Sequence, residues 1–112
     1  MRMTCLLAST LLLFASATFA HAAECKEVGF GKCYSVRARY RIYADGDALW
    51  PIGTKRLLDT TDPKLDEMLE KADRQEYSLF GDFVVCPQSP YMQGHKQSVC
   101  IQSYKNLKLT KR

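Results

Sequence analysis

The number and placement of cysteines constrain the fold of this chain more than any other feature. Cys5 lies within an apolar N-terminal stretch, and Cys25, Cys33, Cys86 and Cys100 follow it in a sequence of 112 residues. An even number of cysteines in a short chain that leaves the cytoplasm predicts two disulfides rather than free thiols. Each disulfide is worth about 2–4 kcal/mol, a large share of the stability of so small a domain.

Counting alone leaves all three disulfide pairings open. We favour Cys86 with Cys100, which joins two neighbouring strands, and Cys25 with Cys33, which joins the start of the exported chain to its first strand. A four-cysteine zinc site is disfavoured because the spacings contain no C-x-x-C pair. The sequence therefore predicts no metal and no other cofactor.

The first 22 residues have the pattern of a cleavable secretory signal. Arg2 supplies the positive end, residues 6–20 contain no charge, and Ala20-His21-Ala22 places small residues at a suitable cleavage point. Residues 1–22 are therefore predicted to be a signal peptide, and residues 23–112 a single small domain that is periplasmic or secreted. No later segment is apolar for long enough to cross a bilayer, so no membrane span is expected in the exported chain.

The charge of the chain is mildly basic. The formal net charge is +4, and removal of the leader takes away one positive charge, from Arg2, and no acidic residue. A dedicated nucleic-acid binder is usually more strongly basic, so nucleic acid is not the expected partner. The balance suits a protein or an anionic polymer of the cell envelope.

Period-two alternation predicts the first strand. From Cys33 to Tyr43, apolar residues alternate with Ser35 and three arginines, which is typical of a strand with one buried face. Asp45-Gly46-Asp47 predicts a hairpin turn. We expect a second strand over residues 48–52, with Pro51 at an edge or a bulge, and a third over residues 54–58.

The second half of the chain combines one helix with two strands. Thr61-Asp62-Pro63 is typical of a helix start, and apolar residues recur at helical spacing to about Asp73. Strands are expected over residues 77–86, bent at Gly81, and over residues 98–104, followed by a basic tail. The order β-β-β-α-β-β predicts a mainly β fold, a small five-stranded OB-like barrel stapled by disulfides, with an open α+β sheet as the alternative.

Three arginines form the clearest candidate surface. Alternation places Arg37, Arg39 and Arg41 on one face of the first strand, at intervals of about 7 Å. That spacing suits neighbouring phosphates or carboxylates of a polymer. The alternative is an ordinary solvated strand face whose charge discourages edge-to-edge pairing and is neutralised by acidic residues on a neighbouring strand.

Two further groups of residues are candidates for binding. Trp50, together with Tyr40, Tyr43, Lys55 and Arg56, could form a stacking platform for sugars or bases. The favoured alternative is that Trp50 is a core or barrel-end residue, because a small domain tends to bury a lone tryptophan.

The second group is the segment around Tyr91, Met92 and His95, which lies between two half-cystines. A stapled and exposed loop of this kind is a common contact surface in small secreted binders, and it is also an ordinary kind of connection.

Catalysis is not predicted. His95 is the one histidine certain to remain after export, so a two-histidine site is excluded, and the remaining cysteines are assigned to disulfides. Pairing of Asp82 with His95, or of Asp45 with Asp47, is conceivable, but an aspartate in a turn usually serves the turn. The sequence contains none of the common catalytic or phosphate-binding motifs.

Residues 33–107 resemble a family of small secreted bacterial proteins without a defined activity. The resemblance rests on these segments: CYSVRAR (33–39), LWPIGTKRLL (49–58), GDFVVCP (81–87), QSVCI (97–101) and Asn106-Leu107. It implies export and disulfide formation and supplies no catalytic residues. The turn at residues 44–47 differs from the Asn-Gly turn of the family, which implies a first hairpin of different length.

Two functions follow as hypotheses. The first is a non-catalytic exported binding module that engages an anionic or protein partner in the envelope, with Arg37, Arg39 and Arg41 as its contact. The second is an inhibitor or immunity-type protein against a secreted hydrolase, with the loop from Tyr91 to His95 as its contact.

Overall fold

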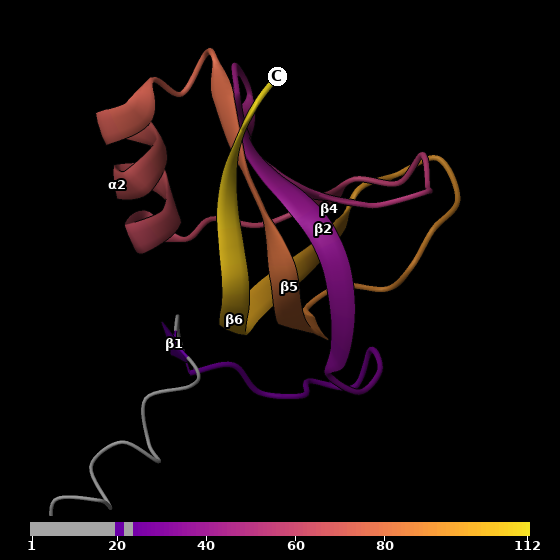
Figure 1. The fold of residues 1–112 in the computed structure, drawn as a ribbon. Helices are drawn as coiled ribbons and strands as arrows, with labels where there is room; N and C mark the ends of the chain where they lie inside the picture. The colour runs from indigo at the N-terminus through magenta and orange to yellow at the C-terminus, as the bar shows by residue number, and fades with distance from the viewer. Residues whose placement is uncertain (1–19, 22–23) are drawn as a thin grey trace, which may run out of the picture.

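A computed structural model describes residues 20–21 and 24–112 (Figure 1). Its elements are β1 (Ala20–His21), β2 (Tyr34–Tyr43), β3 (Gly46–Pro51), β4 (Leu58–Asp59), α2 (Pro63–Ala72), β5 (Tyr77–Pro87) and β6 (Gln97–Lys111). The expected mainly β fold with one helix in the order β-β-β-α-β-β is confirmed for β2 to β6. The predicted signal peptide and its cleavage point lie outside the described residues, apart from the two residues of β1, which pair with β6.

Strands β2 to β6 close into a ring through their pairing. β2 lies between β3 and β5, β5 pairs with β6, and β3 pairs with β4, all antiparallel. The ring closes where β4 meets β6 in parallel, with Leu58 opposite Gln97 and Asp59 opposite Ser98. Only two residue pairs therefore join β4 to β6, whereas β2, β5 and β6 form a long continuous surface.

The interior of the ring is filled by the apolar face of each strand. In β2, Ala38 and Tyr40 are fully buried whereas Arg37 is exposed, which is the alternation that the sequence predicts. The core comprises Ala38, Tyr40, Leu49, Leu58, Leu65, Leu69, Leu79, Phe83, Val85, Val99, Ile101 and Tyr104. Burial of these side chains is the main favourable contribution to folding.

Helix α2 begins and packs as its sequence predicts. The Asp62 side chain accepts hydrogen bonds from the backbone N–H groups of Lys64 and Leu65, each at 3.0 Å, and Pro63 occupies the first turn. Leu65 and Leu69 are buried. The helix lies on one side of the ring, and the connections between β3 and β4 and between β5 and β6 extend on the other (Figure 1). In the described part of the chain, no helix has the length and apolar character needed to cross a membrane.

Two disulfides are present, but the favoured pairing is wrong. Cys33 bonds Cys86, with 4.0 Å between their Cα atoms, and Cys25 bonds Cys100, at 5.8 Å. Cys86 is indeed opposite Cys100 in the β5–β6 register. However, β5 lies between two strands, and its pairing with β2 places Cys33 next to Cys86 as well. Cys86 bonds only one of these neighbours, and Cys100 is left to bond the N-terminal segment.

Two disulfides in one small domain are consistent with an oxidising, extracellular environment. Each bond also spans a large part of the sequence, with separations of 75 and 53 residues. Long closed loops restrict the unfolded chain more than short ones, so this pairing constrains the unfolded chain more than the local pairing we favoured.

Three predicted strands differ from the observed ones at their ends. The second strand begins at Gly46 rather than at residue 48, so the tight turn lies at residues 44–45, and Gly46 and Asp47 belong to β3 instead of the predicted turn. Residues 54–58 are a loop as far as Leu57, because the third strand comprises Leu58–Asp59 alone. The predicted basic tail is instead the second half of β6, which continues to Lys111 because its residues pair with the first half of β5.

A bulge accounts for the predicted bend at Gly81. The β5–β6 register shifts between the Phe80–Lys108 pair and the Asp82–Lys105 pair, so that β6 has an extra residue opposite Gly81. Asn106 takes up this irregularity in the left-handed region, with φ of 56°. A Cβ at Gly81 would lie 2.9 Å from the Leu107 side chain and 3.2 Å from the backbone oxygen of Lys105, so β5 and β6 approach closely here and a larger residue requires β6 to shift.

Candidate functional site

The arginine row, defined as Arg37, Arg39 and Arg41, lies on the outer face of the ring. Arg37 is exposed, and the other two are half-buried. In the register, Arg39 is opposite Trp50 on one side and Phe80 on the other. The row is therefore flanked by aromatic side chains of both neighbouring strands.

Each arginine of the row lies over an aromatic ring. The guanidinium carbon is 4.9 Å from the Phe80 ring centre for Arg37, and 5.8 Å from that of Trp50 for Arg39. For Arg41, the corresponding distance to Tyr43 is 5.1 Å. These are cation–π distances. Because a guanidinium already covers each ring, the rings hold the arginines in place rather than offer stacking surfaces to a ligand.

Only one arginine of the row has an acidic partner within the described residues. Arg37 Nη1 lies 3.6 Å from Asp82 Oδ1, and Asp82 also accepts a hydrogen bond from Asn106. No ion pair involves Arg39 or Arg41 in that part of the chain, and their buried Nε atoms have no hydrogen-bond partner there. An acidic residue on a neighbouring strand thus neutralises Arg37, as the alternative predicts, but none among the described residues neutralises Arg39 or Arg41.

A shallow hollow adjoins the Arg37 end of the row. It has a volume of about 460 Å³ and is lined from β2, β5 and β6, with Arg37, Asp82 and Lys105 as its charged members. A depression thus adjoins one end of the line of charges.

The predicted stacking platform is not assembled. Tyr40 is fully buried in the core and is unable to contact a ligand. Trp50 is half-buried, lies outside the core and is next to the last residue of β3. Its Nε1 donates to the carbonyl of Thr54 at 2.6 Å, which fixes the ring beneath Arg39.

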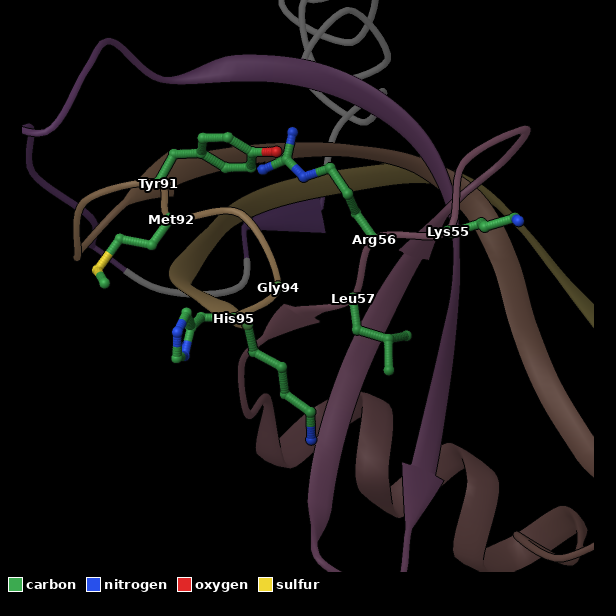
Figure 2. Close-up of a pocket in the computed structure, with 8 residues that line it drawn as sticks. Lys55, Arg56, Leu57, Tyr91, Met92, Gly94 and His95 are labelled. Carbon is green, nitrogen blue, oxygen red and sulfur yellow. The ribbon is translucent and has the colours of Figure 1, made fainter.

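A second group of predicted residues does come together. Lys55, Arg56, Tyr91 and His95 line a cavity of about 230 Å³ between the connections 52–57 and 88–96, which we call the loop pocket. Figure 2 shows the Arg56 guanidinium against the Tyr91 ring, whereas Lys55 points away from it. The guanidinium carbon lies 4.4 Å from the centre of the Tyr91 ring.

Sequence reasoning missed the residue that fixes Arg56. Arg56 Nη2 donates to Gln97 Oε1 at 3.0 Å, and Gln97 Nε2 donates to the carbonyl of Ser89, also at 3.0 Å. Gln97 is buried at the start of β6, 41 residues from Arg56. Because this contact depends on the closure between β4 and β6, no local sequence pattern indicates it.

A half-buried carboxylate cluster was also missed. The Tyr40 hydroxyl donates to Asp66 Oδ1 at 2.7 Å, lies 3.3 Å from Asp47 Oδ2, and accepts from the backbone N–H of Asp62 at 3.0 Å. Burial, followed by a hydrogen bond to Asp66, raises the pKa of Asp47 to about 6. Burial also raises the pKa of Tyr40. The cluster connects β2, β3 and α2 at the helix start, which gives it a structural role.

The two residue pairs considered from sequence, Asp82 with His95 and Asp45 with Asp47, are not formed. Asp47 pairs with Asp66 rather than Asp45, whose side chain lies 3.4 Å from Lys96 Nζ. Asp82 lines the hollow beside Arg37, and His95 lines the loop pocket, so the two do not share a site. Among the described residues, no group of three or more histidine, cysteine, aspartate or glutamate side chains is placed to hold a metal ion.

Comparisons with known proteins add no relative. The chain matches no family model, no curated protein and no solved structure. The resemblance to small secreted bacterial proteins remains a prediction from the sequence motifs, and function has to be argued from the sites themselves.

Proposed function

We propose that this protein is a non-catalytic binding module of the cell envelope, periplasmic or secreted, that engages an anionic partner through the arginine row. The partner is an anionic polymer or an acidic protein surface. The N-terminal signal pattern and the two disulfides support export.

One observation carries this proposal. Arg39 and Arg41 are held over aromatic rings, yet neither forms an ion pair within the described residues. Holding a long side chain in one position before binding lowers the entropy cost of forming the complex. A guanidinium offers a planar fork of donors that matches a carboxylate or a phosphate. The row is therefore a preorganised line of anion-binding groups beside a hollow.

The test is capture from an envelope extract by the exported, oxidised protein. The wild type is compared with Arg39→Gln/Arg41→Gln at about 0.05 M and about 0.5 M salt, since screening shortens the reach of exposed charges. Lys64→Gln/Lys71→Gln is the matched control, because it removes the same charge from exposed positions on α2. We expect the wild type and the control to capture a partner that high salt releases, and the row variant to lose it. Retention by a folded row variant contradicts the proposal.

A second candidate function is inhibition of, or immunity to, a secreted hydrolase. It is favoured by the connection 88–96, which lies between half-cystines bonded to other segments and exposes Tyr91 and Met92 by 56% and 53%. In the same experiment, a protein partner that resists salt, survives the row variant and is lost from Tyr91→Ser/Met92→Ser favours this function instead.

A further inference from the structure

The loop pocket is separate from the arginine row and has a different character. It lies between the connections 52–57 and 88–96, which extend from the side of the ring away from α2 (Figures 1 and 2). The Trp50–Thr54 hydrogen bond and the Arg56–Gln97 contact tie the first connection to β3 and β6. Two independent connections thus form one supported end of the molecule.

The charge around the loop pocket is positive. Lys55, Arg56 and Lys96 are among the residues that line it, and none of the lining residues is acidic. Lys96 forms an ion pair with Asp45. Both side chains are exposed, so the pair neutralises little of the positive charge. The Arg56 guanidinium uses one N–H group for Gln97, and its other N–H groups have no protein acceptor among the described residues. The pocket therefore presents an oriented guanidinium to an anion.

Apolar side chains surround these cations. Tyr91 and Met92 are each more than half exposed, and Ile52, on the other connection, is 48% exposed. Large apolar side chains next to lysine and arginine are the combination that binds an anionic membrane surface, with the apolar groups in the interfacial layer. At about 230 Å³, the cavity is smaller than the usual pocket for a whole organic ligand, about 300–1,000 Å³, and suits a compact anionic group.

We propose that the loop pocket binds the phosphate of an anionic lipid headgroup, with Tyr91 and Met92 entering the interface of the membrane. Arg56 supplies the guanidinium that contacts the phosphate, and Gln97 positions it. This surface is distinct from the arginine row, so either proposal can fail while the other stands.

The test is flotation with lipid vesicles, using protein purified after export and with its N-terminus read by mass spectrometry. Vesicles of phosphatidylcholine alone are compared with vesicles that also contain phosphatidylglycerol. We expect binding to the anionic vesicles only, and a weakening of about fivefold or more for Arg56→Gln, the worth of one cation near an anionic surface. Met92→Ser changes an exposed side chain without changing charge, and it is expected to weaken binding as well.

The control is Arg39→Gln/Arg41→Gln, which removes two charges from residues that do not line the loop pocket and is expected to keep vesicle binding. If this control loses vesicle binding while Arg56→Gln and Met92→Ser keep it, the proposal is overturned, because the arginine row then binds the vesicles. Binding of soluble inorganic phosphate or glycerol phosphate without vesicle binding also overturns it and identifies a soluble ligand. Capture of a protein on the loops with no vesicle binding has the same consequence.

Discussion

The hydroxyl group of Tyr40 is expected to be the most important single polar group for stability. It joins β2 to the start of α2 by donating to Asp66 at 2.7 Å and accepting from the Asp62 N–H at 3.0 Å. Tyr40→Phe removes a hydrogen bond to a charged group, worth about 1.5–3 kcal/mol, and leaves a buried N–H without an acceptor, at a cost of about 1–3 kcal/mol. Because Asp66 is only half-buried and can turn towards water, we expect a net loss of about 2–4 kcal/mol rather than the full sum.

Urea denaturation of the oxidised protein measures this loss. With a denaturant slope of about 1–3 kcal/mol/M, the midpoint is expected to fall by about 1–2 M at unchanged slope. Tyr34→Phe is the matched control, since Tyr34 is half-buried and its hydroxyl has no hydrogen-bond partner among the described residues. It is expected to change stability by less than about 0.5 kcal/mol. A Tyr40→Phe variant as stable as this control refutes the argument that the hydroxyl ties the helix to the sheet.

Three further predictions concern the cluster, the bulge and the disulfides. The folded pKa of Asp47, about 6, lies above its ordinary value of 3.8, so its stabilising effect is complete below the ordinary value and is lost as pH rises through 6. Wild type is therefore expected to lose stability relative to Asp47→Asn between about pH 4 and pH 7, and parallel denaturation profiles of the two proteins contradict this. Gly81→Ala is expected to cost about 1–3 kcal/mol by thermal denaturation, because its Cβ meets the backbone of β6; a neutral effect shows that the bulge adjusts. Peptide mapping without reduction is expected to yield Cys33 with Cys86 and no Cys86–Cys100 peptide.

The elements that are set by local sequence were predictable. Strand β2 follows from its alternation, and the start of α2 follows from Asp62 and Pro63, because each pattern depends on residues within a few positions. The ends of β4 and β6 were not predictable, since they are set by pairing with distant strands. The same limit explains the disulfides: Cys86 has a neighbour on either side of β5, and sequence distance does not show which of them it bonds.

The candidate sites divide in the same way. The alternation of β2 placed Arg37, Arg39 and Arg41 on one face without further information. Their aromatic supports come from three different strands. Phe80 lies 43 positions after Arg37 in the sequence, and only the β2–β5 register brings the two side chains together. Gln97, which orients Arg56, is likewise brought close by ring closure. Sequence therefore indicated the charged groups but not what holds them.

We propose that the guanidinium groups of Arg39 and Arg41 bind an anion of the envelope. The most direct measurement is the NMR signal of their Nε–H groups during titration with the anionic fraction of an envelope extract. Both Nε atoms are buried, so exchange with water is slow enough for the signals to report on each guanidinium. We predict that both signals shift with added ligand and return at high salt. Unchanged Arg39 and Arg41 signals, with shifts confined to residues 88–96, contradict the account and place binding in the loops.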